Sequence, residues 1–180
     1  IETIYYGDSP LVQRNEKTNE EIRLSLGIQN DRKVMILLGR TQVIKGHRLL
    51  LDAMQLLREK KYLLIFLIKE LEEFPEELAI LKNIIQQYQL HDQVKIFGNR
   101  PDLGDFLKCA DLGVVPSLES EVNCRVVVEF FSLGIPVVAC PTGSLSEVIA
   151  DGEGGLICPG KNAGDLAAAI EKVLEDKVLH

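Results

Sequence analysis

The sequence lacks an apolar run long enough to cross a membrane, and it lacks an excess of positive charge. Its longest unbroken apolar run is Tyr62–Ile68, whereas a membrane-spanning helix needs about 20 apolar residues. The formal net charge is −7 and the sequence pI is near 5.1, which argues against nucleic acid or an anionic membrane as the main partner. A basic pocket inside an acidic exterior is compatible with these values, so phosphate ligands are not excluded.

Cysteine and histidine are too scattered for a metal site or a disulfide framework. The four cysteines, Cys109, Cys124, Cys140 and Cys158, include no CxxC pair, so zinc is not expected and a reducing cytosol is the simplest interpretation. No cluster of His, Cys and acidic residues has metal-ligand spacing, and no Ser-His-Asp order stands out. We therefore expect neither a metal nor a Ser-His-Asp triad.

From Lys33 onward the sequence alternates between apolar runs and segments with helical periodicity. Continuous apolar runs of this kind are typical of parallel strands buried on both faces. Six runs are expected to be strands: Val34–Gly39, Tyr62–Ile68, Gln93–Gly98, Asp111–Ser117, Ile135–Cys140 and Gly154–Pro159. Helices are expected at His47–Lys61, Glu76–Leu90, Pro101–Ala110, about Cys124–Leu133, Ser144–Ala150 and from Asn162 or Asp165 to near Val178.

Strands separated by helices of this length form βαβ units with right-handed crossovers. The predicted fold class is therefore α/β, a doubly wound, Rossmann-like parallel sheet of six strands. Residues 33–180 would form this domain. Residues 1–32, with a lone helix near Asn19–Ile28, would be a lead-in that packs on the sheet or the tail of a linker. The chain begins at Ile1 and not at methionine, so we expect it to be cut from a longer protein.

Two cations follow the first predicted strand, at the end where doubly wound sheets bind ligands. The segment from Gly39 to His47 reads GRTQVIKGH, which is neither the GxGxxG fingerprint nor a P-loop. Arg40 and Lys45 could hold an anion, arginine as a planar fork and lysine as a point charge. A solvated surface loop would explain the same residues, so both interpretations stay open.

The loop after the fourth predicted strand leads into a helix that carries a carboxylate in an apolar run. Glu129 lies within Ser120–Ala139, where burial of an unpaired charge is costly. Asn123 is a candidate N-cap, and the free amides near Cys124–Val126 could bind a phosphate, with Glu121 reaching past it. Glu129, one to two turns along the helix, could accept two hydrogen bonds from ribose hydroxyls.

The same acidic residues also have an explanation that needs no ligand. Arg125 precedes Glu129 by one helical turn, so an ion pair on one helix face could neutralise the carboxylate. Glu121 lies near the helix start, where an acidic residue interacts favourably with the helix dipole. The sequence leaves both explanations open, and they do not exclude each other.

Four motifs in this order resemble those of a known enzyme family. They are Gly39–Gly46 (GRTQVIKG), Phe97–Asp102 with Ala110–Ser117 (FGNRPD and ADLGVVPS), Glu121 with Glu129, and Gly134–Glu147 (GIPVVACPTGSLSE). Over roughly residues 1–178 the chain is similar to the C-terminal, donor-binding half of a family-four retaining glycosyltransferase of the GT-B fold.

The resemblance implies roles for the matching residues. Arg40 and Lys45, next to Gly39, would lie on the donor diphosphate and neutralise the leaving group. Glu121 would contact the donor sugar, and Glu129 would bind the ribose hydroxyls. The nucleotide-diphosphate sugar is the substrate, and no metal or other cofactor is required. The remaining contacts are implied at the helix start and in the turn after the third strand: Asn123, Cys124, Arg125 and Val126 near the phosphate, and Asn99 and Arg100 beside the base.

Two departures from the family pattern bear on this site. Val122 and Cys124 stand where the family often has glycine between the two glutamates, which changes how closely a phosphate can approach. A turn with glycine usually follows the second strand, but Phe66–Phe74 (FLIKELEEF) contains none. We expect the loop after the second strand to be reshaped.

The resemblance also implies that this chain is one half of an enzyme. A missing N-terminal domain would bind a glycan or lipid-linked acceptor, and closure of the two halves would assemble the site. The fragment alone should transfer little or no sugar. By analogy, Ser120–Arg125 indicates a subgroup active in bacterial surface polysaccharide or lipopolysaccharide assembly. We expect a cytoplasmic protein, with association of the full-length protein with the inner face of the membrane as an option.

Two other functions stay open from the sequence. A sugar-nucleotide epimerase of related fold would need an acid/base constellation that the sequence does not show. A non-enzymatic nucleotide- or partner-binding module would leave Arg40 and the Arg125–Glu129 pair with structural roles. In that case, substitution of Lys45 or Glu129 would leave nucleotide affinity unchanged.

Overall fold

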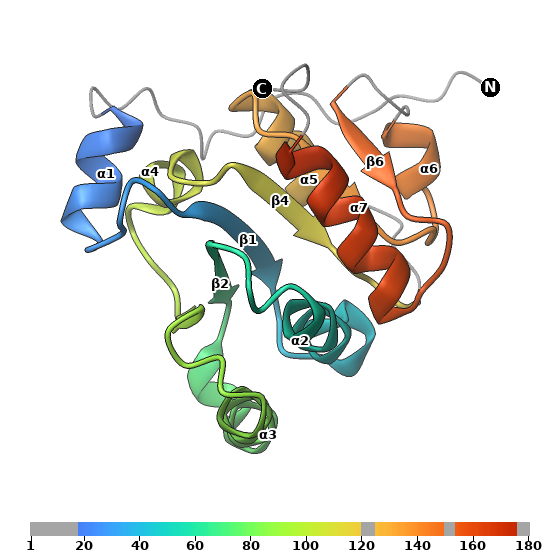
Figure 1. Ribbon diagram of the computed structural model, residues 1–180, viewed down its shortest axis with the longest axis horizontal. Coiled ribbons are helices and arrows are strands. Elements are labelled where there is room, and N and C mark those ends of the chain that lie inside the picture. Colours follow the sequence, from blue (N-terminus) through green and yellow to red (C-terminus); the bar gives the residue numbers. More distant parts are fainter. Residues whose placement is uncertain (1–17, 120–124, 150–153, 176–180) are drawn as a thin grey trace.

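The computed structural model describes residues 18–119, 125–149 and 154–175, which form a six-stranded parallel sheet between two layers of helices (Figure 1). The strands lie in the order β3-β2-β1-β4-β5-β6, and each neighbouring pair is parallel. This arrangement confirms the predicted α/β, doubly wound, Rossmann-like fold. The strands are β1 (Lys33–Gly39), β2 (Tyr62–Ile68), β3 (Val94–Phe97), β4 (Leu112–Val115), β5 (Val137–Ala139) and β6 (Gly155–Ile157).

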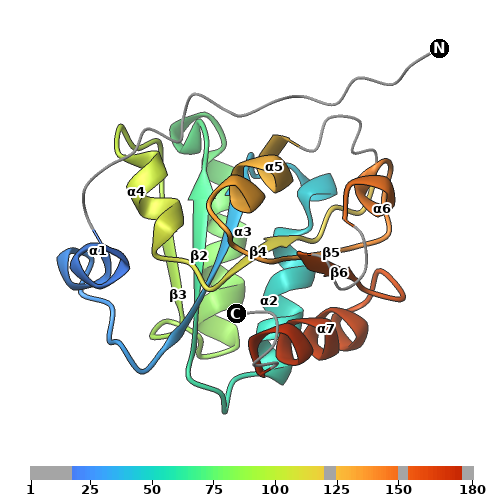
Figure 2. The ribbon, with the colours of Figure 1, turned by 90° about the horizontal axis from the view of Figure 1, so that it is seen from above.

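Helices cover both faces of the sheet, and each face has its own apolar cluster (Figure 2). One face packs against α2 (His47–Leu56), α3 (Pro75–Gln87) and α7 (Ala163–Glu175). The other packs against α1 (Asn19–Ser25), α4 (Leu103–Lys108), α5 (Arg125–Ser132) and α6 (Leu145–Val148).

Strand β2 shows why the apolar runs become strands. All of its residues are buried, because it lies between β1 and β3 and has helices on both sides. Leu64 and Phe66 belong to the cluster under α2 and α3, whereas Leu63 and Ile65 belong to the opposite cluster. An uninterrupted apolar run is therefore what a central parallel strand requires.

The observed elements are mostly shorter than the sequence predicts. Strand β4 ends at Val115, so Pro116 and Ser117 belong to the loop that follows. Helix α4 begins at Leu103 rather than at Pro101. Helix α7 begins at Ala163, and the Asn162 Oδ1 atom accepts a hydrogen bond of 2.9 Å from the backbone N–H of Asp165. The predicted end of this helix near Val178 lies outside the described residues.

The structure describes three of the four cysteines. Cys109, Cys140 and Cys158 are free and buried, as expected for small apolar thiols, whereas Cys124 lies outside the described ranges. None of the helices in the ranges that the structure describes has the length and apolar character needed to cross a bilayer.

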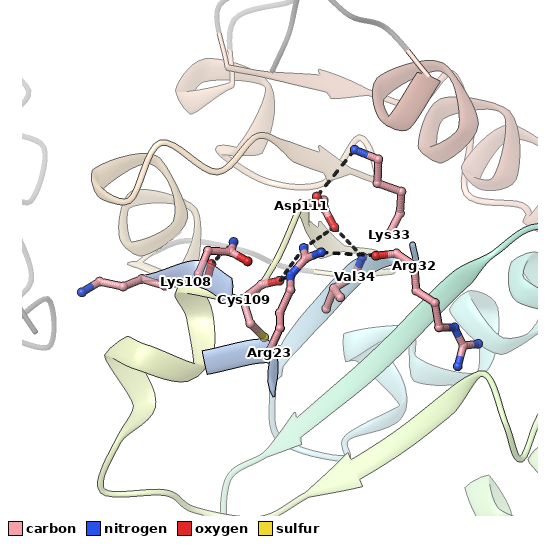
Figure 3. Close-up of polar contacts among 8 residues, drawn as sticks. Arg23, Arg32, Lys33, Val34, Lys108, Cys109 and Asp111 are labelled. Atoms are coloured by element: carbon pink, nitrogen blue, oxygen red, sulfur yellow. Dashed lines mark hydrogen bonds and ion pairs between the residues drawn. The ribbon is translucent and has the colours of Figure 1, made fainter. Parts of the chain in front are cut away.

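A partly buried ion-pair network fixes α1 to the amino edge of the sheet (Figure 3). The Arg23 guanidinium donates to the Asp111 carboxylate at 2.6 Å, and its Nε and Nη2 atoms donate to the Cys109 carbonyl at 3.1 and 2.9 Å. The same Asp111 oxygen accepts a 2.6 Å hydrogen bond from the Val34 N–H at the start of β1. Arg23 thereby links α1 to β1 and to the segment that enters β4.

Replacement of Arg23 by methionine should lower the free energy of unfolding by about 2 kcal/mol, because the partly buried Asp111 carboxylate loses its nearest cation and the buried Cys109 carbonyl loses two donors. Lys33 and the Val34 N–H still contact Asp111 in this variant. Chemical denaturation measures this change. The control is Lys61→Met, which removes an exposed ion pair with Asp31 and should change stability little. Equal stability of the two variants would show that the network does not anchor α1.

Candidate functional site

A cavity lies at the carboxyl edge of the sheet, where the strand order reverses. From β1 the chain passes outward through β2 and β3 and then returns to β4 on the other side of β1. The connections that follow β1 and β4 therefore run toward opposite sides of the sheet. Doubly wound sheets bind ligands in the crevice that forms at such a reversal. The cavity has a volume of about 230 Å³ and is lined by Leu37, Leu38, Gly39, Arg40, Lys45, Lys69, Val114, Val115, Pro116, Ser117, Arg125, Val126 and Glu129.

Gly46 allows the loops after β1 and β4 to touch at one side of this cavity. Its φ is 73°, in the left-handed region that glycine adopts readily. A Cβ atom at this position would collide with the backbone carbonyl of Pro116. The Leu118 N–H also donates to the Ile44 carbonyl at 2.8 Å. The short 3₁₀ turn Val43–Lys45 is thus fixed against the β4 loop, which brings Lys45 to the cavity wall.

Among the described residues, the cavity wall carries four basic side chains and one acidic side chain. The basic residues come from four separate segments: Arg40 directly after β1, Lys45 before α2, Lys69 directly after β2, and Arg125 at the start of α5. Such an excess of positive charge favours an anionic ligand, in contrast to the net negative charge of the chain.

Glu129 is the acidic residue among the described residues of the cavity wall, and the predicted pair with Arg125 is present. Glu129 is only 4% exposed, although it lines the cavity. The Nη2 atom of Arg125 lies 4.0 Å from its Oε1 atom, which is the predicted pair within one helix turn. Arg125 itself is well exposed, with 62% of its side chain accessible. The carboxylate is therefore partly neutralised and still faces the space where a ligand would lie.

Six of the predicted site residues come together at this cavity. They are Gly39, Arg40, Lys45, Arg125, Val126 and Glu129. Glu121, Asn123 and Cys124 lie outside the described residues, so their predicted roles stay predictions.

Asn99 and Arg100, predicted to flank the base, are not part of the cavity wall. The Nε and Nη2 atoms of Arg100 donate to the Asp102 carboxylate at 2.7 and 2.8 Å. The guanidinium also lies 4.5 Å from the centre of the Phe106 ring. These contacts give Arg100 a structural role, while the predicted contact with the base stays a prediction.

Lys69 is the charged residue of the cavity wall that the sequence interpretation missed. It directly follows β2, and its N–H donates to the Gly39 carbonyl at 3.0 Å. Since Gly39 and Ile68 are register partners in neighbouring strands, Arg40 and Lys69 occupy equivalent positions at adjacent strand ends. The available signal was a basic residue directly after each of two buried strands.

His47 begins α2 next to the cavity and is buried in a neutral form. It is 4% exposed, and neither ring nitrogen has a hydrogen-bond partner. Its ring packs edge-on against Phe66, with centroids 5.0 Å apart. Burial, and secondarily the charge of Lys45, lowers the pKa of His47 to about 4. His47 therefore contributes no positive charge to the site at neutral pH.

The described residues offer no ready metal site. Within ranges 18–119, 125–149 and 154–175, His, Cys, Asp and Glu side chains nowhere form a group of three that could hold a metal ion. The arrangement is instead suited to binding an anion through basic side chains and to accepting hydrogen bonds at Glu129.

The sequence matches the model of one protein family over almost its whole length. Residues 18–180 match the family of glycosyl transferases group 1. The chain belongs to the group 1 glycosyltransferases. The resemblance noted from the four motifs is thereby confirmed at the level of the family.

Curated relatives of this glycosyltransferase chain are considerably longer. It is 31% identical over 162 residues to the D-inositol 3-phosphate glycosyltransferase of Arthrobacter sp. (strain FB24), an alignment that covers 86% of this chain and 37% of that protein. It is 30% identical over 187 residues to the glycosyltransferase MJ1607 of Methanocaldococcus jannaschii, covering 98% and 45%. The chain thus spans less than half the length of these relatives.

Solved structures place the glycosyltransferase chain in the GT-B fold, as its C-terminal domain. Anabaena Alr3699/HepE, solved in complex with UDP and glucose, superposes with a TM-score of 0.85 at 25% identity, over 94% of this chain and 45% of that one. The C-terminal domain of the group 1 protein LpcC from Francisella tularensis superposes with a TM-score of 0.80 over 97% and 90%. At 17% identity, the second likeness concerns the fold alone.

Replacement of Gly46 by alanine should destabilise the glycosyltransferase chain more than the same change at Gly134. Both residues have a positive φ, 73° and 71°, but an added Cβ meets nothing within 4 Å at Gly134. Gly134→Ala should cost about 1 kcal/mol from backbone strain. Gly46→Ala should cost about 1–3 kcal/mol more, because the β1 and β4 loops must separate. Chemical denaturation of both variants measures the difference, and equal costs would contradict the close contact with Pro116.

Protonation of His47 should destabilise the fold as the pH falls. Because its pKa is near 4 in the folded state and about 6.5 when unfolded, the unfolded chain binds the extra proton first. Stability due to this residue is therefore complete above about pH 6.5 and falls by as much as about 3 kcal/mol toward pH 4.

The measurement is the free energy of unfolding between pH 4.5 and 7.5 for the wild type, His47→Leu and His91→Gln. The pH dependence should be shallower in His47→Leu than in the wild type. His91→Gln, which changes an exposed histidine, should retain the wild-type slope. An unchanged slope in His47→Leu would mean that His47 is protonated without cost in the folded state.

Proposed function

We propose that the cavity binds a nucleoside diphosphate sugar, and that the chain is the donor-binding domain of a retaining glycosyltransferase that transfers a hexosyl group. The observation that carries this proposal is the convergence of four basic side chains and the buried Glu129 at the reversal of the strand order. A diphosphate requires cations, and a ribose requires a hydrogen-bond acceptor. The basic residues and Glu129 line the same cavity.

In the proposed mechanism, the protein acts mainly through fixed charges. Departure of the nucleoside diphosphate leaves negative charge on its phosphate oxygens. Arg40 and Lys45, which are held at the ends of β1 and of its loop, would stabilise that charge, so the reaction as proposed needs no metal. Glu129 would orient the donor through the ribose. Outside the described residues, Glu121 would contact the sugar and the amides near Cys124 the phosphate.

A uridine diphosphate sugar is the first donor to test. HepE, at 25% identity, has been solved with UDP-glucose as well as with UDP and glucose. The D-inositol 3-phosphate glycosyltransferases and an exopolysaccharide phosphotransferase among the relatives support a role in building glycoconjugates. We propose surface polysaccharide or lipopolysaccharide assembly as the pathway, in the cytoplasm or at the inner face of the membrane.

The acceptor site is proposed to lie on a second domain. This chain spans less than half of its relatives' length, and its cavity lies at the carboxyl edge of the sheet. A glycan or lipid-linked acceptor would be held by the N-terminal domain, and closure of the two domains would exclude water from the reacting sugar. The isolated chain should therefore bind donor and transfer little sugar.

Thermal unfolding with UDP, GDP, ADP and their sugars tests the proposed donor site. One nucleotide at a hundred times its dissociation constant should stabilise the fold by about 2.7 kcal/mol. The shift should disappear in Lys45→Ala and in Glu129→Gln, because each removes a proposed contact. Lys61→Ala, which changes a lysine at the opposite edge of the sheet, should keep the shift. Stabilisation that survives both site substitutions would place the nucleotide elsewhere and favour a binding module of a different kind.

A further inference from the structure

The loop after β2 holds Arg40 in a defined orientation. The Arg40 Nε atom lies 2.9 Å from Glu70 Oε2, and its Nη2 atom donates to Glu70 Oε1 at 3.3 Å. This is the bidentate geometry in which arginine binds carboxylates and phosphates. Arg40 lines the cavity, whereas Glu70 does not. The Glu70 carboxylate therefore pairs with one edge of the Arg40 guanidinium and does not itself line the cavity.

The backbone at Glu70 is strained in a way that supports this contact. Its φ and ψ are 58° and 40°, a left-handed conformation that costs a side-chain-bearing residue roughly 1–2 kcal/mol. Glycine would adopt it without that cost. The loop from Lys69 to Phe74 contains no glycine, so the left-handed conformation falls on a residue that carries a side chain. Gln89 also has a positive φ, of 56°, so the conformation alone assigns no role, and Glu70 is singled out by its contact with Arg40.

The register of β1 and β2 explains how the carboxylate reaches its partner. The Lys69 N–H donates to the Gly39 carbonyl at 3.0 Å, which continues the parallel pairing of the two strands by one residue. The left-handed turn at the next residue directs Glu70 toward Arg40. Lys69 lines the cavity, whereas its neighbour Glu70 lies outside the cavity wall and contacts Arg40.

We propose that Glu70 is a positioning residue that fixes Arg40 so that the second edge of its guanidinium faces a diphosphate in the cavity. A guanidinium has five N–H donors in a rigid fork, and Glu70 engages only the edge formed by Nε and Nη2. The inference rests on the proposed function for the identity of the diphosphate. Electrostatics alone predicts that removal of a negative charge near an anion site strengthens anion binding. If Glu70 positions Arg40, removal of the Glu70 charge should instead weaken anion binding.

Titration calorimetry with inorganic pyrophosphate and with UDP tests the proposal. The variants are Glu70→Gln, Glu70→Gly and Glu70→Asp, with Glu72→Gln as the matched control, since it removes the same charge from the same loop. Thermal unfolding of each variant without ligand is the second measurement. An Arg40→Ala variant, with and without Glu70→Gln, completes a double-mutant cycle.

The expected result separates binding from stability. Glu70→Gln and Glu70→Gly should bind pyrophosphate about tenfold more weakly, because a charge-assisted hydrogen bond of Arg40 is lost or misdirected. Glu70→Gly should nevertheless unfold at the same or a higher temperature, since glycine relieves the strain. Glu70→Asp, which keeps the carboxylate, should recover part of the affinity. Glu72→Gln should bind as tightly as the wild type or slightly more tightly, and Glu70→Gln should have no further effect when Arg40 is alanine.

Three results would overturn the proposal. They are tighter pyrophosphate binding by Glu70→Gln, an equal loss of affinity in the Arg40→Ala background, and no pyrophosphate binding by the wild type. The outcome for the proposed function is read separately. Pyrophosphate binding that depends on Glu70, without binding of any nucleoside diphosphate, would retain this inference and reject the proposed function. UDP binding with the same affinity in the wild type and in the Glu70 variants would retain the proposed function and reject this inference.

Discussion

Strand β1 pairs in parallel with both β2 and β4, and this central pairing dictates how the chain is laid out on either side of it. Because each parallel connection must cross over a face of the sheet, the chain builds outward from β1 in one direction, returns, and builds outward in the other. Because of that reversal, the chain leaves β1 and β4 in opposite directions, and a space remains beyond the carboxyl ends of these two strands. The cavity, its cations and the start of α5 all lie around this point.

Charged side chains are paired at the amino end of β1, whereas basic side chains are in excess at its carboxyl end. At the amino end, the Arg23 guanidinium and the Asp111 carboxylate neutralise each other and also bind backbone groups (Figure 3), so this end is a closed structural network. At the carboxyl end, basic side chains from four segments face one cavity that contains a single described carboxylate. The strands between are apolar, which keeps the charges at the edges and gives the carboxyl edge its positive potential inside an acidic chain.

Particular residues show how far the sequence could be interpreted. The run Tyr62–Ile68 became β2 with the predicted bounds, because seven apolar residues between turn signals fit a strand buried on both faces. Arg40 and Lys45 were singled out because they follow a buried strand at the end where doubly wound sheets bind ligands. Glu129 was singled out because an unpaired carboxylate in an apolar helix is costly to bury. Lys69 was missed, since a single lysine before an acidic loop carries no motif. The ends of β4 and α4 were predicted too far out, because strand and helix termini depend on which backbone groups find partners.

Local patterns of burial and charge in the sequence were enough to predict the alternation of strands and helices, hence the parallel sheet, and the basic residues at strand ends. Which of those residues share a cavity depends on how the strands are ordered in the folded sheet. Arg40, Lys69 and Glu129 are distant in sequence and meet because strand order, not sequence order, sets neighbours at the sheet edge. The contact between Glu70 and Arg40 is of the same kind, since it arises from strand register and one left-handed backbone turn. Neither of these can be read from residue types alone, because both are fixed by hydrogen bonds between strands that the chain joins through a long crossover.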